Sequence, residues 1–255
     1  MLHSSDITKI SASAMAKYKL CKEQPLKYLM YSIMAGFYLV VAIVLSNVSA
    51  AVLYPTFPQF GKLIGALLFP TAIVLIVFVG GELFTGNNMT MAVGSFDKKV
   101  SWLGTLRVWI FSYVGNFIGS FILAFLFVKS GSSASVLTEY YSDIIMPKLE
   151  LDPIQMIIKG ALCNFMVCLA VFIGFRMQTE GGKLVLMFMV ITAFVICGFE
   201  HSIANMGTYV IAHFLLGGLP VGLVIKSMFF VTIGNIIGGA ILLGLPIKLM
   251  EIKEK

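Results

Sequence analysis

Long apolar stretches dominate the chain, and charged residues fall almost entirely between them. A helix needs ~20 mostly apolar residues to cross the ~30 Å hydrocarbon core of a bilayer. Stretches of about this length with few or no charges predict six membrane spans, at about 28–53, 63–81, 108–128, 153–175, 184–216 and 220–247. The fourth contains one charge, Lys159, and the fifth is interrupted at 198–206. An even number of crossings places both termini on the same side, and the fold class is an all-α polytopic membrane protein.

The composition agrees with a membrane location. Hydrophobic residues make up 59% of the 255 residues and charged residues only 12%, whereas an ordinary soluble domain is ~45–50% apolar and ~25% charged. So few charges cannot cover a water-exposed surface, and lipid must cover much of the outside. A net charge of +6 could suggest a nucleic-acid partner, but the basic residues lie in short loops and tails. We therefore expect no nucleic-acid binding.

The placement of basic residues predicts the orientation. Cytoplasmic loops of membrane proteins carry an excess of Lys and Arg. Thirteen such residues fall on the side of the termini, and only three fall on the other side: Lys62, Lys129 and Lys148. We expect both termini to be cytoplasmic and the protein to span the bacterial inner membrane.

The chain divides into a polar N-terminal segment (1–26), a channel domain (27–250) and a short cytoplasmic tail (251–255). The N-terminal segment has no cleavable signal sequence, because the first apolar run is too long. Its apolar residues have helical spacing, which predicts an amphipathic helix on the cytoplasmic interface; a solvated tail is the alternative. These residues are Ile7, Ile10, Ala14, Tyr18 and Cys21.

An internal repeat links the two halves of the channel domain. GELFTGNNM (81–89) aligns with GFEHSIANM (198–206), and GNFIGSFIL (115–123) aligns with GNIIGGAIL (234–242), at nearly the same offset. Such self-similarity indicates a duplication. Each unit, about 27–128 and 153–248, holds three spans, so the second copy must be inverted.

Each repeat has one interrupted span, and the interruptions hold the only carboxylates within the spans, Glu82 and Glu200. Irregular backbone at membrane depth survives only where it is buried in protein or lines a wet cavity. Paired interruptions indicate a substrate site, and half-helices that restart there aim positive dipole ends at the midplane, which suits anions. We interpret the two carboxylates as structural groups that accept freed backbone N–H bonds, and Asn88 and Asn205 as caps of the half-helices.

Four segments resemble the signatures of the formate/nitrite transporter family: GELFTGNN, CNFMVCLAV (163–171), GFEHSIANM and VTIGNIIGG (231–239). The sequence as a whole looks closest to the hydrosulfide-channel branch. The resemblance implies an aquaporin-like six-helix protomer with its own pore, assembled as a homopentamer. It also implies that the substrate is a small monovalent anion such as hydrosulfide, formate or nitrite.

The same resemblance assigns roles by position. His201 matches a central pore histidine, which could donate a hydrogen bond or a proton to an anion, and Thr85 and Asn164 match further pore-lining residues. Lys148 matches a lysine that attracts anions at the outer vestibule, although it could also be an ordinary loop lysine. Hydrophobic constrictions are implied on both sides of the histidine, at Phe69, Val167 and Phe194 outside and at Ile73, Leu83 and Phe84 inside.

Two other classes of function are weighed. An aquaporin-like channel for neutral solutes should have an Asn-Pro-Ala motif at each break, yet neither break contains proline. A membrane enzyme that uses His201 and Glu200 would need a nucleophile or a metal cluster, and none accompanies them. The four cysteines have no metal-ligand spacing, so we expect no enzyme activity, no cofactor and no metal.

Overall fold

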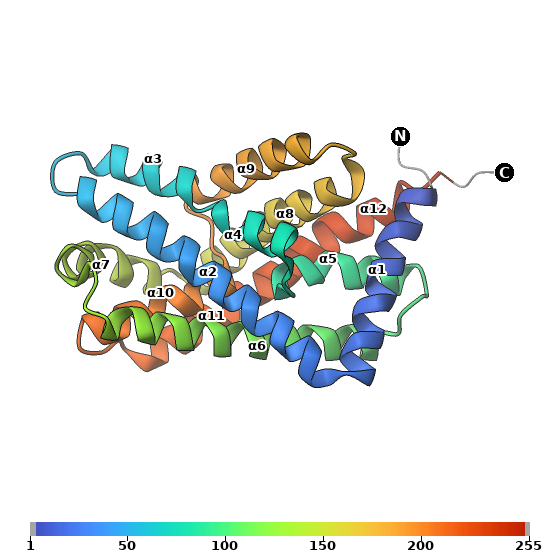
Figure 1. Ribbon diagram of the computed structural model, residues 1–255, viewed down its shortest axis with the longest axis horizontal. Coiled ribbons are helices and arrows are strands. Elements are labelled where there is room, and N and C mark those ends of the chain that lie inside the picture. Colours follow the sequence, from blue (N-terminus) through green and yellow to red (C-terminus); the bar gives the residue numbers. More distant parts are fainter. Residues whose placement is uncertain (1–3, 253–255) are drawn as a thin grey trace.

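The computed structural model describes residues 4–252, and within this range the chain consists of helices without a strand. Most are α-helices, and two short π-helical segments, η1 and η2, continue longer runs (Figure 1). Their bounds are α1 Ser4–Glu23, α2 Pro25–Leu53, α3 Pro58–Leu68, α4 Thr71–Val74, η1 Leu75–Gly80, α5 Phe84–Phe96, α6 Trp102–Lys129, α7 Ala134–Leu149, α8 Pro153–Arg176, α9 Glu180–Ile196, α10 Ser202–Leu215, α11 Val221–Ile236, η2 Ile237–Gly244 and α12 Leu245–Leu249.

Five helical runs of the described chain are long and apolar enough to cross a bilayer: Pro25–Leu53, Pro58–Gly80, Trp102–Lys129, Pro153–Arg176 and Val221–Leu249. The predicted fifth span is divided into α9 and α10, and neither alone reaches the necessary length. Apart from α1, which crosses one end, the helices run roughly along the long axis of the molecule (Figure 1). The protein is therefore an all-α polytopic membrane protein, with one of its predicted crossings broken into two helices.

The segment between α6 and α8 differs from the sequence-based expectation. The sequence predicts no membrane span between about 128 and 153, but this segment forms a helix, α7, of 16 residues. The apolar residues of α7 recur every four positions and are fully buried at Leu137, Tyr141, Ile145 and Leu149. This spacing is that of one helix face, so α7 folds back onto the protein and carries Lys148 with it.

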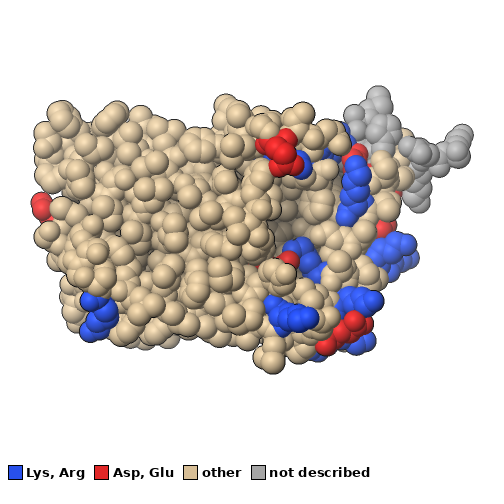
Figure 2. All heavy atoms as spheres, viewed as in Figure 1, with Lys and Arg blue, Asp and Glu red and all other residues tan. Residues whose placement is uncertain are grey.

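Helix α1 is packed on the ends of the other helices rather than free in solvent. Ile7 and Ile10 join a buried cluster with Met89 and Val93 of α5, and Ala14 lies in a second cluster. Both termini lie at this end of the molecule (Figure 1), where the Ser4 hydroxyl donates to the Ile252 carbonyl at 3.0 Å. Basic side chains also gather at this end in the view of Figure 2, while the middle of that face is almost free of charge.

Close glycine contacts hold the long helices together in the same way in both halves. A Cβ added to Gly119 of α6 would lie 2.1 Å from the carbonyl oxygen of Ile33, and one added to Gly238 would lie 2.1 Å from that of Ala161. Both distances are far below van der Waals contact, so only glycine allows these backbones to approach. Small residues serve this purpose in many membrane helix pairs.

Candidate pore site

The first break lies at residues 81–83, between η1 and α5, and one asparagine bridges it. The Asn116 amide donates to the carbonyl oxygens of Ser32 at 2.8 Å and Glu82 at 2.9 Å. Its Oδ1 accepts from the backbone N–H of Phe84 at 2.9 Å. Because no water is available inside a bilayer, backbone groups freed by a break need such partners.

The second break, between α9 and α10, is bridged in the same way by Asn235. Its amide donates to the carbonyl oxygens of Gly160 at 2.8 Å and Glu200 at 2.9 Å. Its Oδ1 accepts from the backbone N–H of Ser202 at 2.8 Å. The three contacts match those of Asn116 one for one, which supports the inverted repeat. Both asparagines stand in the aligned GN dipeptides of the sequence, although their role was not predicted.

Thr85 and His201 connect the two breaks. The Thr85 hydroxyl lies 3.0 Å from Nε2 of His201, and both side chains are buried. On its other side, Nδ1 of His201 accepts the backbone N–H of Ala204 at 3.0 Å, so the imidazole caps α10. Since Nδ1 acts as an acceptor, the network assigns the ring proton to Nε2, which faces Thr85.

Apolar side chains surround this polar pair. A cavity of only about 10 Å³ beside His201 is lined by Phe69, Ile73, Leu83, Val167 and Phe194, together with Leu39, Ala72, Ile76 and Ile191. The rings of Phe69 and Phe194 meet edge to face with centroids 5.8 Å apart, and the ring of Phe194 stacks against His201 at 6.1 Å. A cavity of this size holds about one water molecule at most, so the passage is narrow here.

A larger cavity of about 280 Å³ lies on the side of the termini. Ile73, Ile76 and Leu83 line both this cavity and the small one, so these three side chains separate the two. Lys17 of α1 and Asn87 also line the larger cavity, which we call the inner vestibule. Lys17 was not predicted as a site residue, because a lysine in a polar segment gives no sign of what it meets in the fold.

Each break carboxylate is paired with a lysine from outside the long spans. Nζ of Lys17 lies 2.6 Å from Glu82, and Nζ of Lys148 lies 2.6 Å from Glu200. Glu82 also accepts from the Tyr28 hydroxyl at 2.9 Å. Lys148 is thus not an ordinary loop lysine, and the two breaks have the same type of ion pair.

The structure assigns the predicted caps differently. Asn205 lies inside α10, and its amide donates to Glu200 at 2.9 Å instead of capping the helix. The side chain of Asn88 accepts from the amide of Asn164 at 2.9 Å. The expectation of capping was wrong for both, since they lie beyond the first residue of each helix and His201 caps α10.

Two predicted pore residues face away from the small cavity. Phe84 does not line it; the Phe84 ring packs edge to face on Tyr113 with centroids 5.0 Å apart, toward α6. The Asn164 amide is occupied by the carbonyl oxygens of Thr85 at 3.2 Å and Asn235 at 2.6 Å. Asn164 therefore joins the two breaks rather than offering a free donor.

Helices of membrane-spanning length, two bridged breaks and an enclosed polar pair define a multi-pass membrane transport protein. The sequence pattern of the Formate/nitrite transporter family matches residues 4–249, and the chain belongs to this family. The family description is one of transporters and not of enzymes.

Individual relatives agree with this assignment. The chain is 32% identical to the uncharacterized transporter YwcJ of Bacillus subtilis over 93% of its length and 94% of that protein. It is 31% identical to the nitrite transporter NirC of Escherichia coli over 94% and 89%. Among solved structures, an FNT family ion channel matches with a TM-score of 0.88 and 26% identity, over 95% of this chain and 97% of that one. A pentameric formate channel with formate bound matches with a TM-score of 0.77 and 28% identity, over 90% and 98%.

Proposed function

We propose that this protein is a selective passage for small monovalent anions, hydrosulfide, formate or nitrite, across the bacterial inner membrane. The observation that carries this proposal is the Thr85–His201 pair, a polar contact enclosed by apolar side chains where the passage is narrowest. The names of two similar proteins, a nitrite transporter and a formate channel, support the substrate class.

An anion that enters the narrow cavity loses hydration, and the surrounding Phe and Ile side chains cannot replace it. The Nε2–H group of His201 and the Thr85 hydroxyl are the donors at this point. Helices α5 and α10 both begin at the breaks, so the positive ends of their dipoles add a favourable potential for an anion and an unfavourable one for a cation.

The hydrogen bonds of His201 bear on how a weak-acid anion would cross. Protonating Nδ1 would set an N–H group against the N–H of Ala204 and break the cap of α10. We infer that His201 acts mainly as a neutral hydrogen-bond donor, and that a proton for a weak-acid anion comes from water beside it. Lys17 lines the inner vestibule, where we infer that it attracts anions while Glu82 anchors it. We infer the same role for Lys148, which Glu200 anchors.

The proposal extends to assembly and orientation. We infer a homopentamer in which each protomer has its own pore, since one similar solved structure is pentameric. Residues 27–250 form the channel domain, and the segment 1–26 and the tail 251–255 are cytoplasmic. The basic residues gathered at the end of the termini in Figure 2 support this orientation.

The experiment that tests the function is a flux panel in liposomes. Purified protein should conduct formate, nitrite and hydrosulfide. It should exclude small cations and neutral solutes such as glycerol. The Thr85→Val variant removes the hydroxyl at similar bulk and should reduce anion flux about tenfold or more, since removing one hydrogen bond to a charged group costs ~1.5–3 kcal/mol. Flux of glycerol without flux of any anion would favour the aquaporin-like alternative and overturn the proposal.

A further inference from the structure

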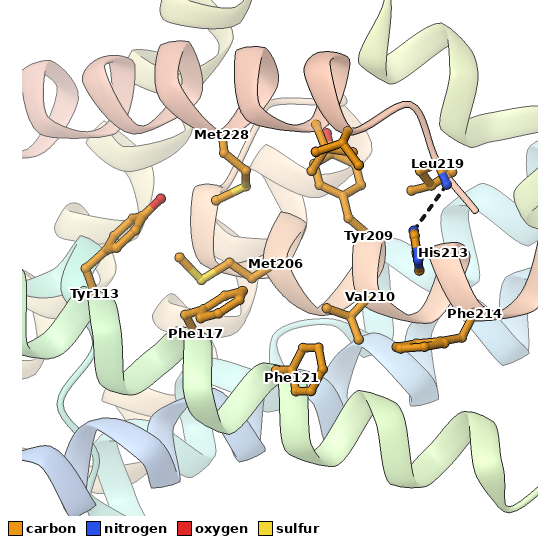
Figure 3. A pocket seen from close by; sticks show the side chains of 12 residues that line it. Tyr113, Phe117, Phe121, Met206, Tyr209, Val210, His213, Phe214, Leu219 and Met228 are labelled. Carbon is orange, nitrogen blue, oxygen red and sulfur yellow. Dashed lines mark hydrogen bonds between the residues drawn. The ribbon is translucent and has the colours of Figure 1, made fainter. Parts of the chain in front are cut away.

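A further cavity, apolar and of about 500 Å³, lies between α6, α10 and α11, on the outside of the pore. Figure 3 shows Phe117 and Phe121 of α6 facing Met206 and Val210 of α10, with Met228 of α11 beside them. None of its lining residues also lines the small cavity or the inner vestibule. Its volume is in the range of ligand sites, ~300–1,000 Å³, and the pore mechanism does not use it.

The cavity has the length of one membrane leaflet. Tyr113, Phe117 and Phe121 follow one another on successive turns of α6 and line it. With 1.5 Å per residue they extend over roughly 12 Å, close to half of a ~30 Å hydrocarbon core. Its inner end lies at Tyr113, whose hydroxyl is 3.2 Å from that of Thr232, its counterpart in the inverted repeat. The cavity thus begins near the middle of the membrane and runs toward the end opposite the termini.

A lysine and a histidine stand at its outer end. His213 lines the cavity, and its Nδ1 accepts the backbone N–H of Leu219 at 3.2 Å (Figure 3), so the neutral ring has its proton on Nε2. The Phe214 ring contacts His213 at 5.3 Å and Phe125 at 5.2 Å between centroids. Nζ of Lys129 lies 5.6 Å from the centroid of Phe125.

The position of Lys129 fits the depth of lipid headgroups. It follows Tyr113 by four to five turns of α6, which corresponds to roughly 24 Å along the helix axis. Half of a bilayer that includes its headgroups is ~20–22 Å thick. An apolar cavity one leaflet deep therefore leads to a lysine at headgroup depth, with a histidine between them.

We propose that this cavity binds an acyl chain of an anionic phospholipid from the leaflet opposite the termini, and that Lys129 and His213 hold its headgroup. An acyl chain is narrow and flexible enough to enter the space between the helices. A helix of a second copy of the chain is ~10–12 Å across and could cover the cavity but not fill it. The basic outer end matches a negatively charged headgroup better than a zwitterionic one.

Native mass spectrometry of the full-length oligomer tests this proposal, with phosphatidylglycerol and phosphatidylcholine of identical chains as probes. Wild-type protein should bind phosphatidylglycerol more tightly. Lys129→Ala should weaken it about fivefold, since a basic residue near an anionic membrane surface contributes ~1 kcal/mol, and should leave phosphatidylcholine nearly unchanged. Lys62→Ala, at the same end but outside the cavity, is the matched control. Val224→Phe, which fills the cavity, should weaken both lipids while anion flux continues.

Three results would overturn the proposal. They are equal binding of the two lipids by the wild type, equal losses in the Lys129 and Lys62 variants, and unchanged lipid binding by Val224→Phe. Cross-linking distinguishes a lipid site from a contact between subunits. If a cysteine at Val224 forms efficient cross-links to a neighbouring subunit of the oligomer, the cavity is a subunit contact and not a lipid site.

Discussion

Lys148 of α7 and Glu200 at the second break form an ion pair, with 2.6 Å between Nζ and Oε2, although they come from different parts of the chain. Only 5% of the Glu200 side chain is exposed, whereas 24% of that of Lys148 is exposed. Lys148 therefore neutralises the charge of a buried carboxylate. The ion pair also ties α7 to the second break.

The first prediction follows from this pair. Lys148→Gln should lower the free energy of unfolding by on the order of 2–3 kcal/mol, below the full cost of breaking a buried pair because Lys148 is partly exposed. Anion flux should also fall, most strongly at low ionic strength, where charges act over longer distances. Thermal unfolding and liposome flux at two salt concentrations measure both effects.

The control for Lys148→Gln is Lys183→Gln, which breaks the exposed pair with Glu180 and should cost at most ~0.5 kcal/mol. A double variant with Glu200→Gln should recover much of the lost stability, because no charge is then left unpaired. Equal stability of Lys148→Gln and Lys183→Gln would argue against a structural role for the pair.

The second prediction concerns the break asparagines. Asn116→Ala and Asn235→Ala each remove three hydrogen bonds to buried backbone groups. Each should destabilise the protein by several kcal/mol, given ~1–3 kcal/mol for every group left unsatisfied. The two losses of stability should be similar. Thermal unfolding and the yield of oligomer in detergent measure them. Asn47→Ala, which removes one bond to Tyr141, should cost clearly less.

The third prediction concerns His201. His201→Asn keeps a good cap for α10 and a donor of similar size, so the variant should fold and assemble normally. Because the wild-type ring accepts the Ala204 N–H at Nδ1 and stays neutral, the substitution removes no group that titrates in this range. The flux of a weak-acid anion through the variant, measured in liposomes from about pH 5.5 to 8, should therefore have the same pH profile as that of the wild type. A variant that loses the pH dependence of the wild type would show that His201 titrates during transport and would contradict its role as a neutral donor.

The fourth prediction concerns pH and the end of the chain. Burial raises the pKa of the Asp97 carboxyl, but the hydrogen bond from Lys248 and the charges of Lys248 and Lys99 outweigh this and lower the pKa below its ordinary value. A carboxyl with a lowered pKa stabilises the folded state above its ordinary pKa, and this contribution is lost as the pH falls through the folded-state value.

Accordingly, Asp97→Asn should lower the Tm at neutral pH. The difference from the wild type should begin to shrink as the pH falls through about 4, the ordinary pKa of an Asp carboxyl, and should vanish below the lowered pKa of the folded state. The effect at neutral pH should be on the order of 1 kcal/mol, since the ion pair is partly exposed. In a Lys248→Met background the same substitution should have little effect at any pH. A Tm difference that grows toward acid would contradict the assignment.

The fifth prediction concerns orientation. A cysteine at exposed Ser132, after α6, should react with a membrane-impermeant maleimide added outside intact cells, and one at exposed Gln178, after α8, should not. The exposed Cys197 must first be replaced by serine so that labelling reports the new site alone. Labelling of position 178 but not 132 would reverse the proposed topology.

The spans and the breaks were predictable because lipid imposes a strong and simple requirement on sequence. A membrane helix must be apolar over its whole length, and a polar interruption such as that around Glu200 stands out against this background. The glycine contacts at Gly119 and Gly238 also left a visible GxxxG pattern. These features depend on neighbours within one helix or on a repeat.

The contacts between distant segments were less predictable. Lys17 and Glu82 are 65 residues apart, and no local pattern indicates that they meet. The inward-facing residues of α7 were visible at a spacing of four, but its polar residues resembled a loop. Phe84 follows Leu83 directly, yet Leu83 lines the small cavity while Phe84 packs on Tyr113 toward α6. The two side chains diverge because successive residues of a helix are rotated by about 100°.

The matched ion pairs at the two breaks have a consequence for the direction of flow. Lys17 with Glu82 and Lys148 with Glu200 place the same type of ion pair beside each break. The pairs themselves therefore favour neither direction, and a preference for one direction would have to come from the basic residues that gather at the end of the termini.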